Sequence, residues 1–296
     1  MTVINNFVIP QSGLAVTTTQ LKKQEQNAVK YCNDQMDTIY DRVVNFTKNL
    51  DSSKGLAVLG PPGVGKTIQV TNALNDSKAS WEDKKSATIS PIGFYCLLYY
   101  NRQKHRVICL DDFDLVYHPN ASHLLTMLKA ATEGSYKPRK LHWDKNPTPY
   151  MIENNIPKTF EFEGNIIWIT NESPATILKT KKLKTHMAPL VGPGGRLSPI
   201  VLKQPDNNDF WGKDLKYYWT KYLIEKKHAL GKNCEKKKGG YSKKIQKMTL
   251  DFFRDEFNNL LDITPRFACN VADDILNFPK SWKTKAFQAN SFVWGE

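Results

Sequence analysis

The spacing of hydrophobic residues changes from one short segment of this chain to the next. Within each segment it has the period of either a helix or a strand. After an irregular lead over residues 1–19, apolar side chains recur at three- to four-residue spacing between positions 20 and 50. This spacing predicts one long helix with a single buried face. The apolar run at residues 56–59 then predicts a short strand that leads directly into a glycine-rich turn.

Beyond that turn, predicted helices and strands alternate up to about residue 205. Helices are expected over residues 66–74, 91–100 and 122–132, and further strands over residues 86–90, 106–110, 165–170 and 200–202. Ser90 and Pro91 have the residue types of a helix cap and first turn. The alternation predicts an α/β fold in which helices cover both faces of a parallel sheet.

The last third of the chain carries only helical patterns. They cover residues 213–229, 249–261 and 265–276, and a polar stretch rich in lysine and glycine at residues 231–247 predicts a loop between the first two. We therefore expect an N-terminal lead and helix over residues 1–50, an α/β core over 51–205 and a helical lid domain over 206–296.

Composition excludes several classes of protein. At 296 residues, 40% hydrophobic and 24% charged, the chain is neither collagen-like nor of low complexity. Its longest apolar run, at residues 92–100, is about half the length of a membrane span. The start of the chain has no basic stretch followed by an apolar core, so we expect an intracellular, cytoplasmic protein without membrane attachment. The five scattered cysteines and six histidines indicate neither a disulfide framework nor a zinc site.

The charge balance points to an anionic partner. Lysine and arginine number 42 against 29 acidic residues, a net charge of +13. This surplus favours nucleic acid over a membrane surface or an acidic protein. A lysine-rich, solvated surface without a partner is the alternative.

The strongest chemical signal is a glycine-rich turn that fits GxxxxGK[ST]. The residues expected to bind nucleotide are Gly60, Pro61, Pro62, Gly63, Val64, Gly65, Lys66, Thr67 and Ile68. A strand before this turn and a helix after it let successive N–H groups surround a phosphate at the helix start. The Lys66 ammonium neutralises β/γ oxygens, and the Thr67 hydroxyl suits Mg²⁺. The segment therefore predicts binding of ATP with Mg²⁺.

A second signal is a pair of acids after a buried strand. The apolar run at residues 107–110 ends in Asp111 and Asp112. Ligands gather at the carboxyl ends of strands in an open parallel sheet. We expect Asp111 to hold the Mg²⁺ shell and Asp112 to orient or deprotonate the attacking water.

The order of these motifs resembles that of the AAA+ superfamily of ring-forming ATPases. The resemblance implies a P-loop ASCE/AAA+ fold with a five-stranded parallel sheet and a C-terminal all-helical lid. It also implies that Asn171, at the end of the strand over residues 165–170, is the sensor 1 residue, and that Arg266 is a RuvB-like sensor 2 residue. Asp112 departs from the usual Glu of the family. The segment before the Asn171 strand is similar to AAA+ ATPases encoded by bacteriophages, so the protein is expected to act in a host cell.

The same resemblance implies an arginine supplied by a neighbouring subunit. Arg196, in a glycine-rich segment, is the first candidate for this catalytic role, and Arg139 is the competitor. A guanidinium delivered between subunits would make ATP hydrolysis depend on assembly into a ring, expected to be a hexamer, or into a filament.

A basic segment with an aromatic residue is the candidate nucleic-acid contact. Its members are Lys137, Arg139, Lys140, Trp143 and Lys145. Basic groups can follow phosphates while an indole stacks on a base. Tyr136 or Trp143 could instead contact a polypeptide, and a solvated loop is the third interpretation.

These observations together predict an ATP-hydrolysing motor that acts on DNA as a replication-associated helicase, helicase loader, translocase or initiator. A protein-remodelling ATPase, with a replication or remodelling partner protein, is the alternative from a different class. A scaffold whose assembly is gated by nucleotide is the third candidate.

Overall fold

The computed structural model describes residues 18–51, 55–85, 89–112, 119–134, 138–173, 181–192, 194–205, 210–234 and 236–290. The chain forms two compact units. The sheet unit comprises Met36–Gly60 and Lys66–Leu202, and the helical unit comprises Met1–Gln35, Pro61–Gly65 and Lys203–Glu296. The domain boundaries expected at residues 50 and 205 stay predictions.

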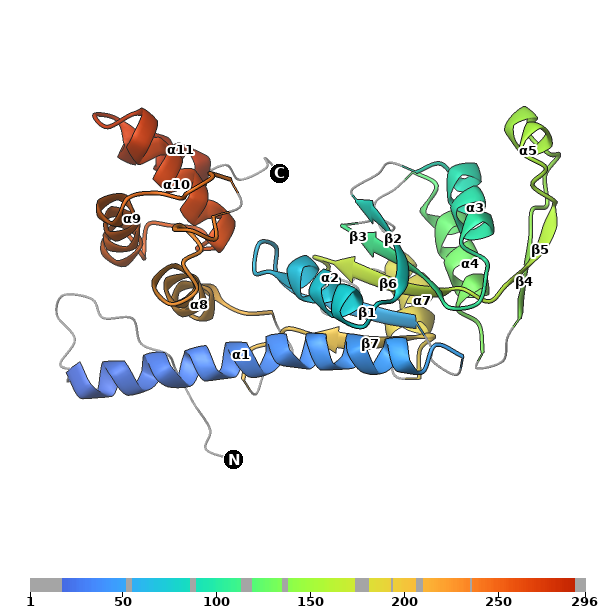
Figure 1. The fold of residues 1–296 in the computed structure, drawn as a ribbon, viewed down its shortest axis with the longest axis horizontal. Helices are drawn as coiled ribbons and strands as arrows, with labels where there is room; N and C mark the ends of the chain where they lie inside the picture. Colours follow the sequence, from blue (N-terminus) through green and yellow to red (C-terminus); the bar gives the residue numbers. More distant parts are fainter. Residues whose placement is uncertain are drawn as a thin grey trace. The chain divides into compact units, whose positions relative to one another are not determined.

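A five-stranded parallel sheet forms the centre of the sheet unit (Figure 1). Its strands are β1 (Gly55–Leu59), β2 (Ser80–Lys85), β3 (Arg106–Asp111), β6 (Asn165–Thr170) and β7 (Leu197–Val201), in the spatial order β2-β3-β6-β1-β7. Every residue of β1 and β6 is buried, as expected for central strands covered on both faces. The predicted α/β class and five-stranded parallel sheet are confirmed.

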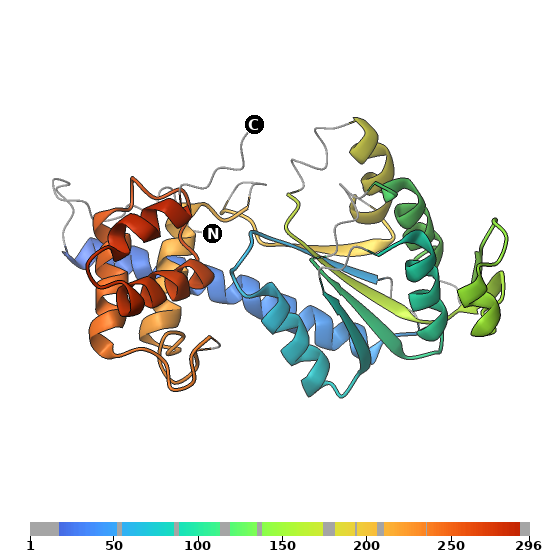
Figure 2. The same ribbon diagram turned by 90° about the horizontal axis from the view of Figure 1, so that it is seen from above.

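Helices lie on both faces of this sheet. Figure 2 shows α3 (Pro91–Tyr100), α4 (Ala121–Ala131) and α7 (Lys181–Val191) together on one face, and α2 (Lys66–Asp76) on the other. The second half of α1 (Thr18–Lys48) lies beside α2, where Tyr40 donates a 2.7 Å hydrogen bond to Asp76. The cap predicted for α3 is present, because Ser90 Oγ accepts from Gly93 N.

Two strands lie earlier than predicted: β7 begins at Leu197, three residues before the predicted position 200, and β2 is displaced further. The edge strand is Ser80–Lys85, whereas the described part of the predicted 86–90 strand leads into α3 and includes its cap, Ser90. Residues 86–88 lie outside the described residues. Strand β2 has β3 as its neighbour on one side only, so it does not need the apolar run that marks a central strand.

The basic segment over residues 137–145, for which a solvated loop was one interpretation, includes one strand of an antiparallel pair. Strands β4 (Arg139–His142) and β5 (Thr159–Phe162) pair with each other, and α5 (Pro149–Glu153) lies between them in sequence. Each strand has only four residues, alternating buried and exposed. Such short alternation is a weak sequence signal.

Four helices and the first half of α1 make up most of the helical unit. They are α8 (Lys213–Glu225), α9 (Lys243–Asp255), α10 (Pro265–Asn277) and α11 (Trp282–Asn290), and α10 packs against the other three. The helical C-terminal region is confirmed, but α9 begins six residues before the predicted position 249 and α11 was not predicted. Ser242 explains the early start, because its Oγ accepts from Ile245 N and caps α9. None of the described helices has the length and apolar character that a membrane span requires.

Candidate functional site

The glycine-rich turn over residues 60–65, called the phosphate loop below, connects β1 to α2. Its backbone angles require glycine at two positions. Gly63 and Gly65 have φ angles of 72° and 107°, in the region that side chains disfavour. The loop begins where Gly60 N donates to the Thr170 carbonyl at 3.3 Å, and α2 begins at Lys66. The first turn of α2 therefore places the partial positive charge of a helix start at the end of the loop.

The Lys66 ammonium is buried within the sheet unit. Its side chain is only 5% exposed, and its Nζ donates to the Gly60 carbonyl at 2.8 Å and to Asn171 Oδ1 at 2.7 Å. Both of these acceptors are neutral groups, a carbonyl and an amide oxygen. A buried cation of this kind is suited to an anionic ligand.

A hydroxyl and a carboxylate in the sheet unit supply two hard oxygen ligands that are hydrogen-bonded to each other. Thr67 Oγ1 donates to Asp111 Oδ1 at 2.9 Å, and Asp111 is 6% exposed at the end of β3. A hydroxyl and a carboxylate are ligands that Mg²⁺ takes together with phosphate oxygens and water. The chemistry of Thr67 and Asp111 therefore fits the expected metal ion.

Asn171 connects the lysine to the second acid. Its Nδ2 donates to Asp112 Oδ1 at 2.8 Å, while its Oδ1 accepts from Lys66. Strand β6 lies between β1 and β3, so a side chain just after β6 can reach groups at the ends of both neighbours. Asp112 has φ +48°, a strained value for a non-glycine residue, and is exposed.

The tip of the phosphate loop packs within the helical unit. A Cβ atom added to Gly63 would lie 3.2 Å from Thr264 Cβ and 3.6 Å from Arg266 Cβ. Thr264 caps α10 by accepting from Phe267 N at 3.1 Å, which fixes Arg266 in the first turn beside the loop. Sequence reasoning missed Trp219 on α8, whose Nε1 donates to the Val64 carbonyl at 3.0 Å. No local pattern marks this contact, because the two residues are 155 positions apart.

Both arginine-finger candidates have partners within their own chain. Arg196 Nη2 lies 3.3 Å from Glu133 Oε1, and the two side chains are 29% and 68% exposed. The same arginine contributes to lowering the pKa of Lys129, after the larger effect of burial. Arg139 is 6% exposed and donates to the carbonyls of Glu133 and Gly164, and its burial lowers its own pKa.

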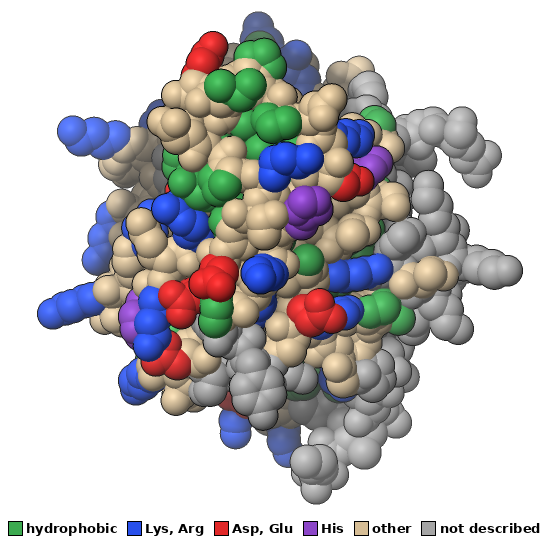
Figure 3. All heavy atoms as spheres, turned by 90° about the vertical axis from the view of Figure 1, so that its right-hand side faces the viewer, with side chains coloured by type: hydrophobic (Ala, Val, Ile, Leu, Met, Phe, Trp, Pro, Cys, Tyr) green, Lys and Arg blue, Asp and Glu red, His purple; other side chains and the backbone are tan. Residues whose placement is uncertain are grey.

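The candidate nucleic-acid residues do not form one surface. Lys140 and Lys145 are exposed, whereas the Arg139 side chain is buried. Trp143 is half-buried beside Tyr95, with ring centroids 5.4 Å apart, and donates to the Asn146 carbonyl. Lys137 lies outside the described residues. Figure 3 shows this side of the sheet unit, where basic and acidic side chains are interspersed and hydrophobic ones gather in one part.

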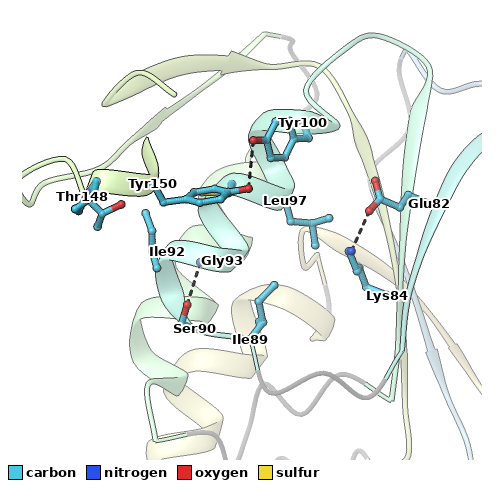
Figure 4. Close-up of a pocket in the computed structure, with 12 residues that line it drawn as sticks. Glu82, Lys84, Ile89, Ser90, Ile92, Gly93, Leu97, Tyr100, Thr148 and Tyr150 are labelled. Carbon is cyan, nitrogen blue, oxygen red and sulfur yellow. Dashed lines mark hydrogen bonds and ion pairs between the residues drawn. The ribbon is translucent and has the colours of Figure 1, made fainter. Parts of the chain in front are cut away.

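A groove of about 520 Å³ lies elsewhere in the sheet unit, between β2, α3 and α5 (Figure 4). Glu82 and Lys84 form a 3.2 Å ion pair on one wall, and the Tyr100 and Tyr150 hydroxyls are 3.4 Å apart on the other. Gly93 lies on α3 between these walls. None of the predicted site residues that the structure describes lines this groove, so it is separate from the phosphate loop.

Comparisons with known proteins give one similar sequence and several similar structures. No family model matches the chain. An uncharacterized 36.7 kDa protein from the nrdC-mobD intergenic region of Enterobacteria phage T4 is 26% identical over 234 residues, which is 78% of this chain. The match covers 66% of the T4 protein, so the chain spans just under two thirds of that relative.

The structural matches include RuvB of Thermotoga maritima, described as a Holliday junction branch migration motor. That structure has a TM-score of 0.40 and 11% identity, covering 93% of this chain and 70% of RuvB. A second structure, of a RuvB mutant, has a TM-score of 0.42 and 11% identity, with coverage of 89% and 69%. The functional assignment therefore depends on the residues of the site.

Proposed function

We propose that this protein is a Mg²⁺-dependent ATPase of the AAA+ type. The observation that carries the proposal is the hydrogen-bonded series Lys66–Asn171–Asp112, beside the Thr67–Asp111 pair. These groups come from the phosphate loop and from the ends of β3 and β6, and they supply a cation, an amide and two carboxylates. A triphosphate and an attacking water need this set of groups.

Each side chain has a separate task in the proposed reaction. Lys66 and the loop N–H groups bind the β- and γ-phosphates, and Thr67 and Asp111 would hold Mg²⁺, which neutralises phosphate charge when bound. Asp112 orients the water or accepts its proton. Asn171 holds the Asp112 carboxylate in position relative to Lys66, which binds the γ-phosphate. Arg266, next to Gly63, contacts the triphosphate from the helical lid.

Assembly into a ring or filament would complete the site. Arg196 is the proposed finger for a neighbouring subunit, and its ion pair with Glu133 would have to open when it reaches a second ATP. Arg139 is a poor finger because its guanidinium is buried and already donates to two carbonyls. This burial supports Arg196 over Arg139.

DNA is the proposed polymer, on the strength of the net charge of +13 and the exposed Lys140 and Lys145. A helicase, helicase loader or translocase would each use such contacts without sequence preference. A protein-remodelling role is the second candidate. It is supported by the exposed apolar side chains Tyr150 and Ile152 on α5, which are 51% and 66% exposed.

ATP hydrolysis measured with and without DNA, over a series of salt concentrations, tests this proposal. We expect hydrolysis that requires Mg²⁺, increases with DNA and loses that increase steeply as salt rises. Hydrolysis that ignores DNA at low salt would favour protein remodelling. Slow turnover with ATP-driven assembly would favour the scaffold. An absence of ATP binding by the folded protein would refute the ATPase itself.

A further inference from the structure

Trp219 holds one particular peptide of the phosphate loop. Its indole Nε1 donates to the Val64 carbonyl at 3.0 Å, and both residues are buried, at 5% and 1% exposed. The bond lies wholly within the helical unit, to which Pro61–Gly65 and α8 both belong. Val64 is two residues before Lys66, so this contact acts on the part of the loop nearest the lysine.

The direction of this carbonyl decides the direction of the next N–H group. In a planar trans peptide, the C=O of one residue and the N–H of the next point in opposite directions. Because the Val64 oxygen points toward the indole, the Gly65 N–H points away from it. Gly65 has φ 107° and no side chain, so no side chain at this position opposes rotation of the peptide. A turned peptide would present an oxygen where the loop should present an N–H group, and an oxygen repels phosphate.

The indole is itself held firmly. Its ring is stacked on Tyr222, with centroids 5.7 Å apart, and meets Trp211 edge-on at 6.0 Å. Trp211 is 2% exposed and donates its own Nε1 to Gln35 Oε1 on α1 at 3.0 Å. Two buried indoles in one cluster therefore make bonds of equal length, one to the phosphate loop and one to a helix.

We infer that Trp219 is a positioning residue that keeps the Val64–Gly65 peptide in the orientation that binds phosphate. The inference rests on the proposed nucleotide site and adds a residue from α8 to it. The orientation of the loop that binds phosphate then depends on a hydrogen bond made inside the helical unit. Trp211, one ring away, has no such role.

The test is a matched pair of variants in the full chain, Trp219→Phe and Trp211→Phe. Each loses one indole N–H and keeps an aromatic ring. We expect Trp219→Phe to weaken binding of Mg²⁺–ATP and of inorganic tripolyphosphate by a similar factor, about three- to tenfold, as loss of one hydrogen bond implies. Trp211→Phe should bind both as the wild type does. In turnover assays Trp219→Phe should raise KM and leave kcat within about twofold.

Thermal unfolding of both variants separates positioning from stability. Equal lowering of Tm with weaker binding in Trp219→Phe alone supports the inference. Unchanged binding in Trp219→Phe, or equal weakening in both variants, overturns it. If Trp219→Phe does not fold, benzothienylalanine at position 219 keeps the ring shape and lacks the N–H, and the same outcomes apply. Failure of the wild type to bind either ligand would refute the proposed function instead.

Discussion

Asn171 Nδ2 donates a 2.8 Å hydrogen bond to Asp112 Oδ1, joining the ends of two neighbouring strands. The bond holds an exposed carboxylate whose backbone is in the left-handed region, at φ +48°. Strained backbone persists where surrounding contacts hold it, and functional sites are common places for it. The amide and the carboxylate therefore act as a unit, and their variants should show it.

Removing both the amide and the carboxylate should cost less than the sum of the single losses. We expect Asp112→Asn and Asn171→Ala each to lower kcat by about 10²- to 10⁴-fold while ATP binding remains. Since the two groups share one hydrogen bond, the double variant should be about as slow as the slower single variant. Steady-state kinetics of the three proteins make the comparison, and strictly additive losses would mean that the residues act separately.

Loss of the buried cation should abolish nucleotide binding. Lys66→Ala removes the ammonium that lies 2.8 Å from the Gly60 carbonyl, together with its attraction for phosphate. We expect ATP affinity to fall more than about hundredfold by calorimetry. Lys48→Ala, which removes an exposed lysine at the end of α1, is the matched control and should bind ATP normally. Retained affinity in Lys66→Ala would contradict the phosphate-loop assignment.

Arg196 should act across a subunit boundary. Arg196→Ala and Asp112→Asn proteins, each inactive alone, should recover part of the turnover when mixed, because some sites then combine an intact carboxylate with an intact arginine. Glu133→Ala frees Arg196 from its ion pair and should not lower turnover. No recovery on mixing would remove Arg196 from the site.

Substitution of the exposed Lys140 and Lys145 should change DNA binding, whereas substitution of the buried Arg139 should change stability. Lys140→Ala and Lys145→Ala should weaken DNA binding and reduce the slope of log affinity against log salt by about 0.7 to 0.9 for each phosphate that the variant no longer neutralises. Arg139→Met should leave the slope unchanged but lower the free energy of unfolding by about 1–3 kcal/mol, since two carbonyls lose a donor. A reduced slope for Arg139→Met would show that the arginine reaches DNA.

Tyr241 should make stability depend on pH in the alkaline range. Burial, and then the hydrogen bond to Asp273, raise the pKa of Tyr241 above its ordinary value. The folded state therefore favours the neutral phenol, so its contribution is complete below about pH 10 and is lost as pH rises toward the folded pKa. Urea unfolding should show Tyr241→Phe about 1 kcal/mol less stable at pH 8, with the gap narrowing at pH 11. A gap that is constant with pH would exclude this titration.

The sequence alone determined the local parts of the fold and the site. Strand β6 has its predicted bounds and Ser90 caps α3, because each depends on residues within a few positions of one another. The glycines of the phosphate loop and the two acids after β3 could also be identified from the sequence. Backbone freedom and a carboxylate at the end of a strand are local properties. Edge strand β2 was misplaced because most of its residues are polar and it pairs with one neighbouring strand.

Tertiary structure decided which of these parts meet. Asn171 reaches both Lys66 and Asp112 because β6 lies between β1 and β3, and strand order does not follow from the sequence of any one strand. Packing across 155 positions brought Trp219 to Val64, and the strand pair β4–β5 buried Arg139, whose charge had suggested an exposed role. Residue type and spacing report local backbone preference, whereas burial and long-range hydrogen bonds depend on how the whole chain packs.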